Sequence, residues 1–187
     1  ANYHHGEASL QNAIFVRGYY GPGGVQMRLL VPDGDFGTRA EGGKNHASAR
    51  YAHVALNQAI FSALFPPDDM YLLQYTPIDG SVYEPDYFVP VVPLAICETR
   101  QMPAHGWKIN IWARELVDVI NIVKHMIFNG TGAVPVYMRP YRGPWTGTFG
   151  RIGKHEYSFG TYRRVQDGLN VKLIITELPY RVWTKPY

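Results

Sequence analysis

The chain has 187 residues, of which 46% are hydrophobic and 18% are charged, so a packed core is expected and an intrinsically disordered chain is excluded. Cys97 is the only cysteine, which excludes an intrachain disulfide and favours a reducing, intracellular compartment. No apolar run approaches the roughly 18 residues of a membrane-spanning helix, so no membrane partner is expected.

The first predicted element is a helix over residues 7–18, in which Leu10, Ala13 and Ile14 recur at helical spacing and Gly18 marks the end. His4 and His5 come directly before it. A histidine at a helix N-terminus can help to bind a phosphate or can protonate a leaving oxygen. The alternatives are a capping pair or a metal-binding pair, although adjacent histidines on a helix point away from each other.

A short strand is predicted over residues 27–31, followed by a wing-like, glycine-rich loop over residues 31–44. Its glycines let backbone amides approach a ligand closely, and Arg39 and Lys44 would then meet DNA phosphates. A hairpin loop with solvated cations explains the same residues. Asp33 and Asp35 are interpreted as turn residues, so no metal ligand is assigned in this chain.

The pair Arg50-Tyr51 supplies the chemistry of a transesterification. A phenolate is both a good nucleophile and a good leaving group, and a neighbouring guanidinium lowers the pKa of the phenol and stabilises charge on phosphorus. The alternative is an ordinary packed or surface tyrosine. Apolar residues between Ala52 and Leu64 hold helical spacing, which predicts a helix with Tyr51 at its N-terminal margin.

The second half of the chain predicts an apolar strand over residues 87–95 and a helix from Leu116 that closes at Asn129-Gly130. Three strands over residues 147–153, 155–164 and 170–177 indicate an antiparallel sheet. Residues 139–187 hold nine basic and three acidic side chains, which fits contact with DNA phosphates or an ordinary solvated surface.

The expected fold class is α+β. It consists of a partial winged-helix unit over residues 1–86, which carries the catalytic tyrosine, followed by a strand-rich α+β unit over residues 87–187.

Several strings of this chain resemble the DNA-breakage core of eukaryotic and viral type IIA DNA topoisomerases. They are Tyr3-His4-His5-Gly6-Glu7, Phe36-Gly37-Thr38-Arg39-Ala40, Gly42-Gly43-Lys44, Ala49-Arg50-Tyr51, Trp145-Thr146-Gly147-Thr148 and Glu177-Leu178-Pro179-Tyr180-Arg181. The resemblance spans nearly the whole chain, and divergence between the strings suggests the viral branch. It implies that Tyr51 is the nucleophile, Arg50 its activator and His5 a phosphate contact, with His4, Lys44 and Arg39 near the DNA. The second unit would be tower-like.

One segment departs from that family. Where its members insert an isoleucine between base pairs, this chain has Gln101-Met102-Pro103-Ala104. Met102 or Pro103 would then be the wedge, since both residue types unstack base steps in DNA-bending proteins. A plain surface turn is the alternative.

The resemblance implies an ATP-dependent enzyme that breaks and rejoins double-stranded DNA through a 5′-phosphotyrosyl link, as a homodimer. The chain lacks an initiator methionine and is expected to be a piece of a longer protein. Mg²⁺ and ATP would be bound by domains absent from it. The expected location is the host cytoplasm for a viral protein and otherwise the nucleus. The alternative is a non-catalytic winged-helix module that binds or bends DNA; a tyrosine recombinase or a rolling-circle nickase fits less well.

Overall fold

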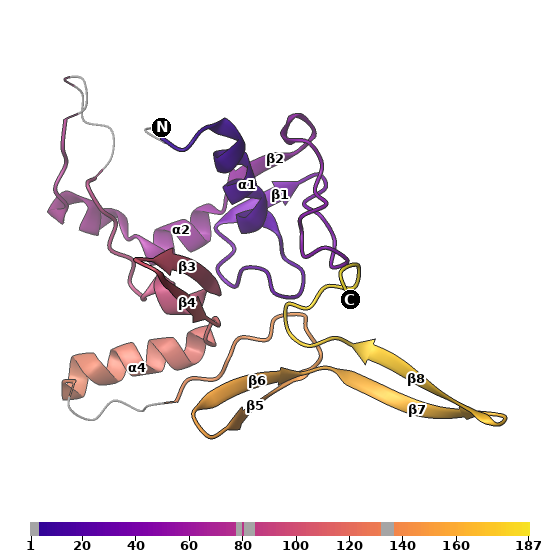
Figure 1. Cartoon of the computed structure of the whole chain (residues 1–187). Helices are drawn as coiled ribbons and strands as arrows, with labels where there is room; N and C mark the ends of the chain where they lie inside the picture. The colour runs from indigo at the N-terminus through magenta and orange to yellow at the C-terminus, as the bar shows by residue number, and fades with distance from the viewer. Residues whose placement is uncertain (1–3, 78–79, 81–84, 132–136) are drawn as a thin grey trace. The chain divides into compact units, whose positions relative to one another are not determined.

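The computed structural model describes residues 4–77, 80, 85–131 and 137–187 (Figure 1). The chain divides into two compact units, the first made of residues 1–26, 32–54 and 140–187 and the second of residues 27–31 and 55–139. The sequence placed a domain boundary at residue 86, which falls within the second unit. That boundary stays a prediction, whereas the expected α+β class is confirmed.

Helix α1 (Glu7–Gly18) has the predicted bounds and opens the first unit. Phe15 on its buried face stacks on His46, with ring centroids 3.7 Å apart, and packs against Phe36 at 4.9 Å. Gly18 is needed at the helix end, because a Cβ there would lie 2.4 Å from the Phe36 ring. These contacts fix the loop after the first strand against α1.

The predicted helix over residues 52–64 is wrong in its first half. Strand β1 (Leu30–Asp33) pairs with β2 (His53–Leu56), the 3₁₀ helix η1 (Ala49–Tyr51) precedes β2, and only α2 (Gln58–Leu64) is helical. Pairing with β1 overrides the helical spacing of the small residues. Asn57 begins α2, because its side-chain oxygen accepts a hydrogen bond from the Ile60 amide at 3.4 Å.

The second unit contains η2 (Pro67–Leu72), α3 (Leu94–Cys97), the hairpin of β3 (Arg100–Ala104) with β4 (Trp107–Ile111), and α4 (Leu116–Asn129). The predicted strand over residues 87–95 is wrong: residues 87–93 form no strand and α3 follows, because Pro90 and Pro93 cannot donate to a ladder. Helix α4 ends as predicted at Gly130, whose φ is 74°. The buried core consists of Met27, Leu64, Val92, Cys97 and Val119.

The C-terminal part of the first unit is built from two successive antiparallel hairpins, β5 (Thr148–Ile152) with β6 (His155–Phe159) and β7 (Thr161–Asp167) with β8 (Asn170–Glu177) (Figure 1). The expected single sheet is therefore two separate two-stranded sheets among the described residues. The predicted strand 155–164 breaks at Gly160, where a Cβ would lie 2.3 Å from the Glu177 carbonyl oxygen.

Candidate functional site

Tyr51 is the last residue of η1, and its amide donates to the Ser48 carbonyl at 2.9 Å. Its side chain is 69% exposed. The strand β2 follows directly, so the phenol does not stand at the start of an α-helix and receives no help from a helix dipole, contrary to the sequence prediction. An exposed phenol on a short, hydrogen-bonded turn is accessible to a macromolecular substrate.

Two cationic side chains near Tyr51 in the sequence are exposed to solvent. The side chains of Arg50 and Lys44 are exposed, and neither has an ion-pair partner among the residues that the structure describes. An unpaired guanidinium next to a phenol can contact the non-bridging oxygens of a phosphate. Arg50 and Tyr51, which are neighbours in the sequence, are therefore both exposed.

His4 and His5 are exposed and lie just ahead of α1. The N-cap of α1 is Gly6, which has a φ of 84° and no side chain that could cap the helix. His4, His5, Arg39, Lys44, Arg50 and Tyr51 all belong to the first unit. The DNA contacts assigned to the two histidines stay predictions.

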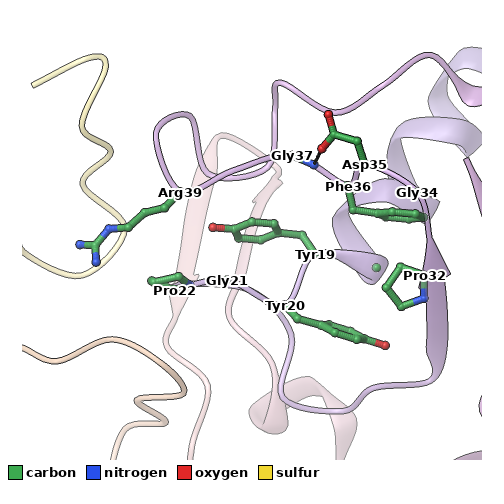
Figure 2. A pocket seen from close by; sticks show the side chains of 11 residues that line it. Tyr19, Tyr20, Gly21, Pro22, Pro32, Gly34, Asp35, Phe36, Gly37 and Arg39 are labelled. Atoms are coloured by element: carbon green, nitrogen blue, oxygen red, sulfur yellow. Dashed lines mark hydrogen bonds between the residues drawn. The ribbon is translucent and has the colours of Figure 1, made fainter. Parts of the chain in front are cut away.

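The loop between β1 and η1 is held in shape by hydrogen bonds among its own residues. The Asn45 side-chain oxygen accepts from the Thr38 amide at 2.9 Å, and the Gly43 amide donates to the Thr38 carbonyl at 2.9 Å. At the start of the loop, the Asp35 carboxylate accepts from the Gly37 amide at 2.8 Å, the bond drawn in Figure 2. The loop therefore has a defined shape, and Asp35 is a turn residue, as the sequence predicted. The same prediction is wrong for Asp33, which is the last residue of β1.

The two glycines before Lys44 have a packing role that the sequence did not indicate. A Cβ on Gly42 would lie 2.2 Å from the Trp183 ring, and one on Gly43 would lie 2.9 Å from the Tyr19 ring. Both backbones also have positive φ, at 63° and 83°. Aromatic rings thus occupy the positions where side chains would stand.

A recess of about 360 Å³ lies beside this loop (Figure 2). Tyr19, Phe36 and Arg39 help to line it, and Figure 2 shows the Arg39 side chain pointing away from the Tyr19 phenol. Burial raises the pKa of Tyr19, and the charge of Arg39 opposes that rise. Gly34, which also lines the recess, would place a Cβ 3.0 Å from the Tyr51 carbonyl oxygen, so the recess adjoins the backbone of the candidate nucleophile.

Arg39, which the sequence assigned to DNA, makes a two-pronged ion pair with Glu177 at the end of β8. The Glu177 side chain is only 2% exposed. It also accepts from the Thr146 amide at 3.0 Å, from the Thr146 hydroxyl at 2.7 Å and from the Leu178 amide at 2.9 Å. Burial alone would raise the pKa of Glu177, but hydrogen bonds from Arg39 and Thr146 outweigh it and lower the pKa to about 2.

Sequence reasoning missed Glu177 and its neighbour Trp145 as parts of this site. Trp145 is 2% exposed, and its indole N–H donates to the Leu178 carbonyl at 2.8 Å. One signal was present, since Glu177 is the only acidic residue after Asp167. A lone carboxylate that ends a strand in a basic segment indicates a cationic partner elsewhere in the chain.

Met102 and Pro103, the predicted wedge, lie in β3 of the second unit, near the tip of the hairpin. Their backbone partners in β4 are Ile109 and Lys108. The turn at the tip contains His105 and Gly106, with φ of 47° and 81°. The segment is therefore part of a regular hairpin and not only a surface turn. The structure does not describe the side chains of Met102 and Pro103, so their role as a wedge stays a prediction.

The described residues do not form a Mg²⁺ site. Across the described parts of the chain, no three His, Cys, Asp or Glu side chains come together as metal ligands would. No step of the chemistry below is routed through the cation. The same described segments include no helix of a length and apolar character that would cross a membrane.

Comparisons with known proteins agree along the whole chain. Residues 1–187 match the protein family described as the A subunit of DNA gyrase/topoisomerase IV. The chain is 37% identical to a DNA topoisomerase 2 of African swine fever virus (isolate Tick/Malawi/Lil 20-1/1983), over 99% of this chain and 16% of the relative. It is 35% identical to DNA topoisomerase 2 of Candida glabrata, over 97% of this chain and 12% of the relative. For DNA topoisomerase 2-alpha of Gallus gallus the identity is 32%, over 100% and 12%.

A solved structure is also similar, the DNA-binding, cleavage and re-ligation domain of Plasmodium falciparum topoisomerase II. Its TM-score is 0.86 at 30% identity, and the match covers all of this chain and 25% of that one. The chain spans only 12% to 16% of the length of the curated relatives named above. The divergent segments favoured the African swine fever virus enzyme in particular, but fungal and bird relatives are nearly as similar, so the likeness is to the family and not specifically to that enzyme.

Proposed function

Because the chain belongs to the family of the DNA gyrase/topoisomerase IV A subunit, we propose that it is the strand-breaking and rejoining part of an ATP-dependent type IIA DNA topoisomerase. The observation that carries the proposal is the exposed phenol of Tyr51 directly after Arg50 in the chain, where the exposed Arg50 guanidinium has no ion-pair partner among the described residues. The substrate is double-stranded DNA, and a protein that contains this chain acts as a homodimer.

In the proposed reaction the Tyr51 hydroxyl loses its proton and its oxygen attacks a backbone phosphorus. A bond forms between that oxygen and phosphorus as the bond from phosphorus to the 3′ oxygen breaks. The 3′ oxygen takes up a proton and leaves as a hydroxyl, while the 5′ phosphate stays on Tyr51. Reversal of the same step rejoins the strand, because a phenolate is a good leaving group.

The other residues act on the phosphate charge. Arg50 presents a planar fork of donors to the non-bridging oxygens, where negative charge grows as phosphorus becomes five-coordinate. His5 donates a hydrogen bond to a phosphate oxygen, with His4 next to it. Lys44 holds a neighbouring backbone phosphate. Met102 or Pro103 unstacks a base step and bends the duplex.

The remaining parts of the proposal concern the whole protein. Mg²⁺ and ATP are bound by other domains, and the metal would supply further neutralisation of phosphate charge. Membership of the viral branch rests on the 37% identity to African swine fever virus relatives, and a tree built from full-length sequences tests it. A viral protein would act in the host cytoplasm and a cellular one in the nucleus, which tagging and microscopy would check.

Covalent trapping tests the function. The protein that contains this chain is mixed with end-labelled duplex DNA and Mg²⁺ or Mn²⁺, quenched with detergent, and examined for labelled protein. The expected result is a 5′-linked adduct that disappears in Tyr51→Phe and persists in Tyr71→Phe, which changes another exposed tyrosine. DNA retention without any adduct would support the non-catalytic binding and bending module instead.

A further inference from the structure

Glu177 has no hydrogen-bonding capacity left for a substrate. Its two oxygens accept from both terminal nitrogens of Arg39, from the amide and hydroxyl of Thr146, and from the Leu178 amide. With the side chain 2% exposed, these five donors replace the water that an isolated carboxylate would hold. Arg39 is the only one of the donors that comes from the loop between β1 and η1.

The same loop is fixed to the C-terminal segment at two further points. The Lys185 amide donates to the Ala40 carbonyl at 3.0 Å, and the Trp183 ring fills the space above Gly42. The Lys185 ammonium also pairs with Glu41 at 2.7 Å, but there the lysine is 70% exposed. Residues 39–42 thus lie on the segment 177–185, and all of them belong to the first unit.

Both terminal nitrogens of Arg39 bond Glu177, so carrying the guanidinium over to a phosphate would require this pair to open. Moving the guanidinium to a phosphate would leave the Glu177 carboxylate buried without its cation, which is far more costly than separating two exposed charges. Lys44, at the other end of the loop, is exposed and has no ion-pair partner among the described residues. Lys44 can therefore bind a phosphate without breaking an ion pair among the described residues.

We propose that Arg39 and Glu177 are positioning residues, which hold residues 37–45 so that Lys44 faces the DNA, and that Arg39 is not itself a phosphate contact. This inference rests on the proposed function for its DNA partner. The pair clamps the loop to the end of β8, and the loop in turn adjoins the Tyr51 backbone through Gly34. Losing either side chain therefore loosens the loop without removing a charge from the DNA-binding surface.

The test uses the protein that contains this chain, with Arg39→Gln, Glu177→Gln, the double variant, Lys44→Gln, and Lys185→Gln as the control for the exposed ion pair. We measure the salt dependence of duplex binding, the amount of trapped adduct, and hydrogen exchange of residues 37–45. Arg39→Gln and Glu177→Gln should each lower the adduct about tenfold and speed exchange in the loop, with the double variant no worse than either. Lys185→Gln should change each readout less than about twofold.

The salt dependence separates positioning from contact. A residue that neutralises one phosphate contributes about 0.9 to the slope of log affinity against log salt, so Lys44→Gln should lower the slope by about 1 while Arg39→Gln leaves it unchanged. The inference is overturned if Arg39→Gln also lowers the slope by about 1, or if Glu177→Gln tightens DNA binding by releasing Arg39.

A second variant and a second readout cover the cases in which the glutamine variants do not fold or no adduct forms. If the glutamine variants fail to fold, Arg39→Lys keeps the charge but loses the two-pronged geometry, so it should still speed loop exchange with an unchanged slope; unchanged exchange would contradict the clamp. If the unaltered protein forms no adduct, the proposed function fails, and the exchange of residues 37–45 alone then supports or contradicts the clamp.

Discussion

The phenol of Tyr51 is 69% exposed and follows Arg50, whose guanidinium has no ion-pair partner among the described residues, whereas the carboxylate of Glu177 is 2% exposed and accepts five hydrogen bonds. Both groups lie in the first unit. The difference separates two tasks that we propose for polar side chains of one unit. The groups proposed to meet the substrate are exposed, and Glu177, proposed to hold the loop in place, is buried and hydrogen-bonded.

Substitutions at the buried site of Glu177 and at the exposed site of Tyr51 should also differ in their effect on stability. Removing a satisfied, buried group leaves partners without bonds or a cavity without atoms, so stability falls. Removing an exposed group leaves the fold almost unchanged, so any loss of function can be assigned to the chemistry. The largest changes in the free energy of unfolding are therefore expected at buried residues.

Trp145→Ala should lower the free energy of unfolding by about 3 to 5 kcal/mol, because it removes a ring that is 2% exposed and leaves a large cavity. The ring packs against Phe149 and Tyr180 at 4.8 and 5.3 Å. Urea unfolding followed by circular dichroism measures the change. Trp107→Ala, at a site that is 80% exposed, should cost less than about 0.5 kcal/mol. Equal costs at the two sites would contradict the burial of Trp145.

Gly42→Ala should lower the free energy of unfolding by about 2 to 4 kcal/mol, since it combines a left-handed backbone with displacement of the Trp183 ring. Gly153 is a matched control: its φ is 61° against 63° for Gly42, but a Cβ there would meet nothing within 4 Å. Gly153→Ala should therefore cost only about 1 kcal/mol. A difference between the two variants isolates the packing of Trp183, and no difference would argue that the loop does not rest on that ring.

Acid should weaken the Glu177 cluster. The folded pKa of Glu177 is lowered to about 2 from its ordinary value of 4.5, so its contribution is complete above pH 4.5 and is lost as the pH falls towards 2. We expect a loss of about 2 kcal/mol over that window, allowing for the partial exposure of Arg39. The Asp118 carboxylate, bonded to Arg139, has its pKa lowered to about 2 as well.

The two acidic groups can be separated by their variants. Unfolding curves for Glu177→Gln should show a flatter dependence on pH between 4.5 and 2 than those for the unaltered chain. Asp118→Asn serves as the control, because it removes the second group that titrates in this window and leaves the Arg39 pair intact. A pH dependence that Glu177→Gln leaves unchanged would show that the carboxylate is not held in its ionised form by the fold.

The contrast between the two surroundings also explains what the sequence could predict. Helices α1 and α4 were predictable because apolar periodicity and a terminal glycine agree within a single segment. The first half of the predicted helix 52–64 is wrong because pairing with the distant strand β1 (Leu30–Asp33) decides its conformation. Local pattern carries no information about such a partner.

The candidate site divides in the same way. Arg50 and Tyr51 are adjacent in the chain, so their combination is visible in the sequence, as is the resemblance that they carry. Arg39 and Glu177 are 138 residues apart, and only the fold brings them together. The sequence assigned Arg39 to the DNA from its charge and from the family resemblance, neither of which indicates Glu177, and it interpreted Gly42 as a place for a ligand where the structure has the Trp183 ring.

The smallest expected change in stability belongs to the residue with the largest expected role in the chemistry. Tyr51→Phe removes one hydroxyl from a side chain that is 69% exposed, so the free energy of unfolding should stay within about 0.5 kcal/mol. Tyr71→Phe, at 88% exposure, should behave identically in urea unfolding. If Tyr51→Phe instead cost more than about 1 kcal/mol and Tyr71→Phe did not, the phenol would have a structural partner. Loss of the DNA adduct in that variant would then no longer identify Tyr51 as the nucleophile, because a disturbed loop would produce the same result.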